Sequence, residues 1–403
     1  MPNLISKEKI ALISSQVLST LVMLITGKII AVKFEPSEFG TYGIQYAVYM
    51  FIFSCLLSPV IQFLKTNNNN LNKKIGYRPY IPLFAFLCVC LLIVMFFYMG
   101  FSDTAITWWL FIGLSSFCFS DVLLKVILDK LNTDGKLITF AIFSFFHKLS
   151  MLIFLVAVVY LFTVLDSSLL WMYMILATAV TVLFGITFVK FNFSNTYKIS
   201  TIKLSKKVFI YAIPLSVMSI FAWFTTYFDR FAIEHYLEVS EVGIYSASYG
   251  VGTKFAIVLI PIFLAAITPI VYGQYNLKEK KLIIEKYAKS YMILAFIIIF
   301  IVYLAYPFIG LYLLSEQYEA GFHIIPSINL GYFLLTFSYI FESLFYSESK
   351  TSYILYLNVL AALLNIILNI ILIPIYGIDG AVIATVLSSA VKLIVVFLVY
   401  KKL

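Results

Sequence analysis

The chain is built almost entirely from apolar runs, each long enough to cross a lipid bilayer as a helix. A helix rises roughly 1.5 Å per residue, so a hydrocarbon core of roughly 30 Å takes roughly 20 residues. Long unbroken apolar runs indicate helices, because the strands of a membrane barrel alternate apolar and polar residues. We therefore predict an all-α polytopic membrane protein with twelve transmembrane helices: 10–32, 40–64, 80–101, 105–128, 137–163, 168–189, 208–236, 241–272, 288–314, 323–346, 352–373 and 378–400.

The composition favours the membrane over a soluble fold. Hydrophobic residues make up 63% of the 403 residues, charged residues make up 12%, and the mean hydropathy is +1.02. A soluble chain of this length needs more polar surface to cover its core. The loops between the runs are too short to form a folded domain, so we expect no enzyme activity and no cofactor.

Two short features fit the same picture. Residues 10–32 are longer than the apolar core of a secretory signal and lack a small-residue cleavage site, which indicates an uncleaved first span. No cysteine has a partner at metal-ligand spacing, so we expect no metal site. All four cysteines lie inside apolar runs, and we interpret them as packing residues: Cys55, Cys88, Cys90 and Cys118.

Basic residues gather in alternate loops. Most of the 28 Lys and Arg residues lie on one side, notably in 65–79, 190–207 and 273–287, whereas the opposite loops carry acidic residues such as Glu38 and Glu241. This asymmetry is typical of cytoplasmic loops. We therefore predict that both termini are cytoplasmic, and we attribute the formal charge of +9 to topology rather than to nucleic-acid binding.

A short motif occurs twice, about half the chain length apart. Pro36–Val48 and Val239–Val251 share Ser, Glu, Gly, Tyr, Tyr and Val at matching positions. Six predicted spans separate the copies, and an even number keeps the two halves in the same orientation. The pattern predicts two parallel six-helix bundles, 1–203 and 204–403, facing each other across a central cavity. Chance similarity between two polar turns is the alternative.

Basic residues inside the spans are the first candidates for function, because an intramembrane charge costs roughly 2.5 to 3.5 kcal/mol at the bilayer centre. Lys148 and Lys254 fall near the middle of their spans. Lys28 and Arg230 fall toward the outer third, at near-equivalent positions of the two halves. Arg offers paired donors and Lys a movable point charge, which suits a doubly anionic head group such as a pyrophosphate. We predict that these four side chains line a cationic cavity.

Other intramembrane residues are candidates for ion coupling or charge pairing. Asp229 either neutralises the arginine that follows it or pairs elsewhere, and Lys392 is either a cavity residue or a lysine reaching the interface. His147 is either a core histidine or a proton relay. Asp121 and Glu342 lie near the inner ends of their spans, where reaching the interface explains them.

Three amides share one face of the eleventh predicted span. Asn358, Asn365 and Asn369 follow a spacing of seven and four residues, which places them on the same side of a helix. Hydrogen bonds between helices and the lining of a cavity both explain such a stripe.

Three segments carry a resemblance to a known family. They are Ile213-Pro214-Leu215, Asp229-Arg230 followed by Glu241–Ala247, and Leu364–Asn369 leading to Ile373–Thr385. With the twelve spans, the chain resembles the Wzx-type O-antigen and polysaccharide flippases of the multidrug/oligosaccharidyl-lipid/polysaccharide (MOP) exporter superfamily, whose fold is MATE-like.

The resemblance implies a function and partners. A relative of this kind moves an undecaprenyl-diphosphate-linked oligosaccharide, an O-antigen or capsule repeat unit, from the cytoplasmic to the periplasmic leaflet of the bacterial inner membrane by alternating access. A polysaccharide polymerase and a chain-length regulator are expected partners in lipopolysaccharide biosynthesis. The alternatives are a cation-coupled multidrug exporter, which relies on buried carboxylates, and an O-antigen polymerase, which needs a sizeable periplasmic loop.

Overall fold

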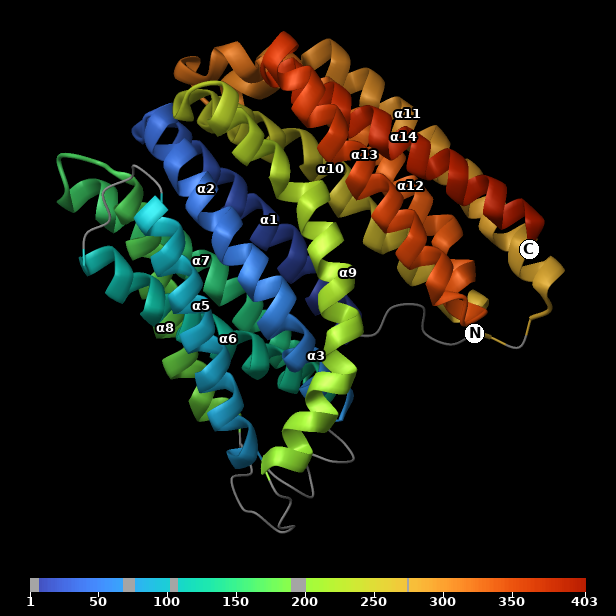
Figure 1. Ribbon diagram of the computed structural model, residues 1–403, viewed down its shortest axis with the longest axis horizontal. Coiled ribbons are helices and arrows are strands. Elements are labelled where there is room, and N and C mark those ends of the chain that lie inside the picture. The colour runs from blue at the N-terminus through green and yellow to red at the C-terminus, as the bar shows by residue number, and fades with distance from the viewer. Residues whose placement is uncertain (1–6, 68–76, 102–107, 190–200, 274) are drawn as a thin grey trace. The chain divides into compact units, whose positions relative to one another are not determined.

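The computed structural model describes residues 7–67, 77–101, 108–189, 201–273 and 275–403. Within these ranges every predicted apolar run lies in a helix (Figure 1), so the all-α class is confirmed. Among the described residues, ten helices are long and apolar enough to cross a membrane, and Ile81–Ile93 is a shorter apolar stretch. The helix Trp108–Thr133, which covers residues 108–128 of the fourth predicted run, is not among the ten, and it carries several charged side chains.

The helices follow one another with short connections. Proline lies inside four of the long helices that the structure describes, at Pro214, Pro261, Pro269, Pro307 and Pro374, and does not end them. The elements are α1 (Lys7–Lys33), α2 (Pro36–Ile52), the π-helix η1 (Phe53–Leu57), α3 (Ser58–Thr66), the 3₁₀ turn η2 (Arg78–Tyr80), α5 (Ile81–Phe101), α6 (Trp108–Thr133), α7 (Leu137–Leu161), α8 (Ser167–Phe188), α9 (Thr201–Tyr236), α10 (Val239–Val271), α11 (Leu277–Leu313), the 3₁₀ helix η3 (Glu316–Ile324), α12 (Ile325–Ser347), α13 (Thr351–Tyr376) and α14 (Ile378–Lys402).

The described residues group into two compact units. The first comprises those within Met1–Phe34 and Gln45–Ile220, and the second comprises Glu35–Ile44 and Phe221–Leu403. The first turns of α2 therefore belong to the second unit. The division at 203 that the repeat suggests remains a prediction about how the chain is built.

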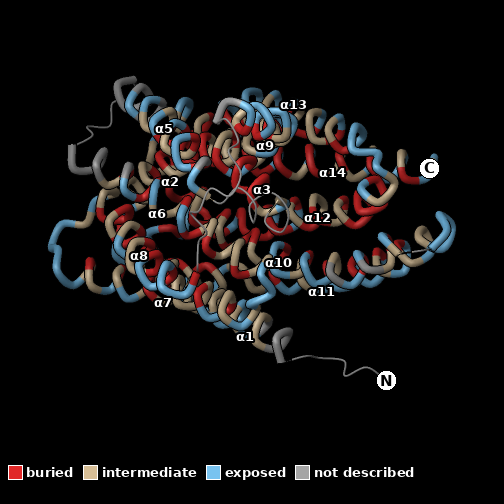
Figure 2. Tube along the Cα trace, turned by 90° about the horizontal axis from the view of Figure 1, so that it is seen from below, coloured by how far each residue is buried: buried red, intermediate tan, exposed pale blue. Residues whose placement is uncertain are grey.

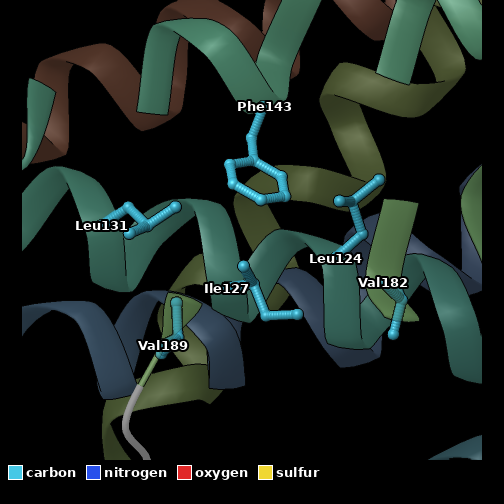
Figure 3. Close-up of a cluster of buried hydrophobic side chains, with 6 residues drawn as sticks. All are labelled: Leu124, Ile127, Leu131, Phe143, Val182 and Val189. Atoms are coloured by element: carbon cyan, nitrogen blue, oxygen red, sulfur yellow. The ribbon is translucent and has the colours of Figure 1, made fainter. Parts of the chain in front are cut away.

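The first unit packs α1 against α7, α7 against α8, and α8 against α6. Its centre contains a cluster of buried apolar side chains (Figure 3). Gly185 of α8 brings this helix close to α6, because an added Cβ would lie 3.1 Å from Ile127. In a bilayer such contacts stabilise by van der Waals packing, since lipid is as apolar as the side chains. The cluster consists of Leu124, Ile127, Leu131, Phe143, Val182 and Val189.

The second unit is organised around α12, which packs against α10, α11 and α14, while α13 packs against α14. Figure 2 shows mostly buried residues along α12 and many exposed ones along α11. Exposed apolar side chains of α11 such as Phe296 and Phe308 suit contact with lipid.

The two copies of the repeated motif meet inside the second unit. A Cβ on Gly40 would overlap the carbonyl oxygen of Val239, and a Cβ on Gly243 would overlap that of Pro36. These positions correspond in the two copies, so the contact is reciprocal. Gly43 likewise faces Ser246, its counterpart, with 3.4 Å between an added Cβ and the serine Oγ. A local two-fold relation between the copies produces such a pattern, whereas chance similarity does not require it.

Candidate functional site

Asp229 and Arg230 form a buried ion pair on α9. The Arg230 Nη1 atom donates to Asp229 Oδ1 at 3.1 Å and to the carbonyl oxygen of Thr226 at 2.8 Å. Tyr245 of α10 donates its hydroxyl proton to Asp229 Oδ2 at 2.5 Å. Asp229 is 2% exposed and Arg230 7% exposed. The two charges therefore compensate each other, and the carboxylate oxygens have donors on both sides.

Tyrosines enclose the guanidinium of Arg230. Its Cζ atom lies 5.1 Å from the ring centre of Tyr227 and 5.0 Å from that of Tyr249, which are cation–π distances. The Tyr249 hydroxyl is 2.6 Å from that of Tyr332 on α12. The sequence did not single out these rings among 29 tyrosines. Membership of Tyr245 and Tyr249 in the repeated motif is the sequence signal that could have identified two of them.

A second buried ion pair joins α12 and α14. Lys392 Nζ lies 3.1 Å from Glu342 Oε1, with the side chains 2% and 4% exposed. The same Nζ donates to Asn358 Oδ1 of α13 at 2.8 Å and lies 4.9 Å from the centre of the Tyr339 ring. The prediction that Glu342 reaches the interface was wrong, because packing of α12 on α14 turns the carboxylate toward Lys392. Lys392 likewise points into the unit.

The remaining amides of α13 also bond within the second unit. Asn365 Nδ2 donates to Ser388 Oγ of α14 at 3.3 Å, and Asn369 Nδ2 donates to Asn365 Oδ1 at 3.0 Å. Both asparagines are buried. Hydrogen bonds to α14 thus account for Asn358 and Asn365, whereas Asn369 bonds within α13.

The first unit has its own polar cluster around Asp121 of α6. Asp121 Oδ2 lies 2.9 Å from Lys125 Nζ and accepts the hydroxyl proton of Tyr49 at 2.6 Å. Lys125 Nζ also lies 3.4 Å from the centre of the Phe53 ring in η1. Lys148 of α7 interacts electrostatically with both Asp121 and Lys125. The cluster therefore holds one carboxylate and two lysines.

His147 and Lys148 differ in their immediate contacts. His147 Nδ1 is 3.4 Å from Thr181 Oγ1 of α8, a contact suited to a core histidine. Lys148 Nζ lies 3.9 Å from Met151 Sδ and has no carboxylate at ion-pair distance within the described ranges. Asp121, which interacts with Lys148 over a longer distance, already pairs with Lys125.

Lys254 of α10 is the second candidate cation without a carboxylate at ion-pair distance among the residues that the structure describes. It is half-buried, and no described residue forms a hydrogen bond or an ion pair with it. Lys28 of α1 is also half-buried. Of the four predicted cavity cations, Arg230 is thus neutralised by its neighbour, whereas Lys148 and Lys254 carry charge that the described side chains leave uncompensated at ion-pair distance.

The fold has several counterparts among solved structures. An inward-facing multidrug resistance MATE-family transporter of the MOP superfamily superposes with a TM-score of 0.74 and 17% identity, covering 95% of this chain and 94% of that one. The lipid II flippase MurJ in an inward closed conformation gives a TM-score of 0.74 and 15% identity, with 98% and 87% covered. A MOP superfamily transporter from Pyrococcus furiosus, described with a binding pocket of reverse polarity that suggests a different function, gives 0.66 and 13%, with 98% and 93% covered.

These comparisons define the class of fold. The chain has the helical fold of the MOP-superfamily transporters, a group that here includes both multidrug transporters and a lipid flippase. At these identities the likeness concerns the fold alone. No protein-family model matches the chain, and no curated protein matches its sequence.

Proposed function

We propose that this protein is a flippase that moves an undecaprenyl-diphosphate-linked oligosaccharide, an O-antigen or capsule repeat unit, across the bacterial inner membrane by alternating access. The observation that carries the proposal is the presence of two half-buried intramembrane lysines, Lys148 and Lys254, without a carboxylate at ion-pair distance among the described residues. A buried charge without a partner is costly. A doubly anionic diphosphate would supply the missing counter-charge.

The pairing of the carboxylates also favours an anionic substrate over a cationic one. Asp121, Asp229 and Glu342 each lie within 3.1 Å of a basic side chain. A carboxylate that already has a cationic partner is poorly placed to bind a cationic drug, because the drug must displace that partner. Anion binding by the unpaired lysines requires no such exchange.

Transport in a deletion strain tests the proposal. Loss of the protein should leave lipid-linked repeat units in the inner leaflet, where a membrane-impermeant sugar-binding probe added outside does not reach them. The double variant Lys148→Gln/Lys254→Gln should fail to restore flipping. The matched control is Lys278→Gln/Lys286→Gln, which removes two exposed lysines at the start of α11. Wild-type flipping by the Lys148/Lys254 variant would contradict the assignment of these lysines.

A cation-coupled multidrug exporter is the second candidate, favoured by the MATE-family transporters among the structural neighbours. Proteoliposomes distinguish the two functions. An exporter should expel a cationic dye when a proton or sodium gradient is applied, and Asp229→Asn should abolish the movement. A flippase should instead translocate a fluorescent lipid-linked oligosaccharide and leave the dye distribution unchanged.

Cellular placement follows from the proposed substrate. The proposal locates the chain in the bacterial inner membrane with both termini cytoplasmic, as the alternating basic loops predict. A polysaccharide polymerase and a chain-length regulator would receive the flipped unit. Co-purification of either protein from the native host, with loss of the association in a deletion strain, checks this part.

A further inference from the structure

A cavity of about 650 Å³ opens between α11, α12 and α14 of the second unit. Its walls are mainly apolar and include Met292 of α11, Phe341 of α12 and Phe397 of α14. In Figure 2, α12 lies between α11 and α14, in agreement with its packing against both. A volume of this size is typical of small-molecule sites.

The cavity lies where α11 begins and α14 ends. Tyr400 of α14 donates its hydroxyl proton to the carbonyl oxygen of Lys281 at 3.1 Å, and the C terminus lies beside the start of α11 in Figure 1. Lys281 Nζ lies 5.5 Å from the centre of the same Tyr400 ring. These contacts hold the start of α11 and the end of α14 together.

Charge at the cavity is positive. Lys289 and Lys401 line it together with a single carboxylate, Glu285, and both lysines are exposed. Lys401 Nζ lies 4.6 Å from the centre of the Phe397 ring, so the charge sits above the apolar wall. Two nearby carboxylates are engaged elsewhere. Glu279 caps the start of α11, and Glu348 lies 2.8 Å from Lys280.

The surroundings of the cavity suit lipid rather than water. Ile293 and Phe296 of α11 are 60% and 70% exposed, and Ile394 of α14 is 58% exposed. Apolar side chains this open on a membrane protein meet hydrocarbon. The basic helix ends fit the cytoplasmic interface, where anionic lipid head groups are attracted by Lys and Arg.

We propose that this cavity binds an anionic glycerophospholipid. Lys289 and Lys401 hold the head-group phosphate, and the apolar walls formed by Met292, Phe341 and Phe397 contact the upper part of an acyl chain. An apolar floor excludes a freely soluble phosphate compound as the preferred ligand, because such a ligand gains nothing from those walls. The site does not include the lysines assigned to the transported substrate. Its test is therefore independent of the proposed function.

Lipid retention and thermal stability test the site. The full chain is purified, delipidated and incorporated into nanodiscs of phosphatidylcholine with or without phosphatidylglycerol, and bound lipid is counted by native mass spectrometry after release. The variant Lys289→Gln/Lys401→Gln should bind phosphatidylglycerol about tenfold more weakly than wild type. The control Lys278→Gln/Lys286→Gln changes the net charge equally at the same helix end, and should bind as wild type does.

A cavity-filling variant provides a second, independent test of the lipid site. Met292→Trp places a large side chain in the cavity, and Ile293→Trp places the same side chain on the neighbouring exposed position of α11. Only Met292→Trp should lose the thermal stabilisation by phosphatidylglycerol. Equal binding by Lys289→Gln/Lys401→Gln and its control would overturn the proposal. Equal stabilisation of wild type by soluble glycerol phosphate would also overturn it, because the acyl chain would then play no part.

Discussion

At the scale of single residues, the membrane interior makes charge pairing the dominant constraint. Asp229 and Arg230 are adjacent in sequence and both nearly fully buried. A buried pair is weak evidence for extra stability, yet removal of one partner leaves the other uncompensated. The Tyr245 hydroxyl adds a second donor to the carboxylate. The cluster therefore behaves as a unit in which each member depends on the others.

Replacement of Asp229 by Asn should lower the free energy of unfolding by roughly 3 to 5 kcal/mol, because Arg230 stays charged and buried. Denaturation in detergent, followed by tryptophan fluorescence, measures the loss. The control is Asp379→Asn, since Asp379 pairs with His323 at 2.9 Å with both side chains about half exposed. Exposed pairs contribute little. Losses of the same size in both variants would show that the burial of the Asp229 pair has no energetic consequence.

The Glu342 and Lys392 pair should show strong coupling in a double-mutant cycle. Lys392→Met alone leaves Glu342 charged and buried, whereas Lys392→Met with Glu342→Met removes both charges. We expect the double variant to be more stable than Lys392→Met. Thermal denaturation of all four proteins gives the coupling. The same cycle on Lys280 and Glu348, a more exposed pair at 2.8 Å, should give a much smaller value, and an equal value would refute the argument.

At the scale of elements, the meeting of α2 with α10 depends on the absence of side chains at two glycines. Pro36 and Val239 present carbonyl oxygens where a Cβ on Gly243 or Gly40 would lie. Backbone atoms have no alternative rotamer, so the helix ends themselves would have to separate. The repeated Ser-Glu-x-Gly-x-Tyr turn thus allows a close contact between its two copies.

Gly243→Ala should therefore destabilise the second unit by about 1 to 3 kcal/mol, the usual cost of overpacking. Gly250→Ala on the same helix should be neutral or stabilising, because nothing lies within 4 Å of the added Cβ and alanine favours helix. Melting temperature and monodispersity in detergent report both effects. If the two variants melt alike, the close approach at Gly243 does not occur in the membrane.

At the scale of the whole molecule, the alternation of basic and acidic loops predicts the orientation in the bilayer. A reporter fused after Gly135, in the turn between α6 and α7, should lie in the cytoplasm, and one fused after Asp166, at the start of α8, should lie in the periplasm. Green fluorescent protein should fluoresce only in the first fusion, and alkaline phosphatase should be active only in the second. The reverse result would invert the topology and place the phospholipid cavity in the other leaflet.

Much of the fold was predictable because few backbone conformations are stable in a lipid bilayer. Apolar runs in a bilayer must satisfy their backbone hydrogen bonds internally, so the run 137–163 became α7 and the run 352–373 became α13. The charged residues inside the spans were identifiable in the same way, since an ionisable residue such as Lys254 interrupts an apolar run. The repeat was also recognisable from the sequence, because Gly and Tyr keep the same spacing in both copies of the motif.

By itself, the sequence determined the helical class, the order of the helices and the positions of charge along them. Only the tertiary structure decided which charges meet. Glu342 and Lys392 lie on different helices, and their pairing at 3.1 Å depends on how α12 and α14 rotate about their axes to pack. The same packing left Lys148 and Lys254 without a carboxylate at ion-pair distance in the described ranges. Helix rotation is set by side-chain fit between neighbours, which the order of residues along one helix does not reveal.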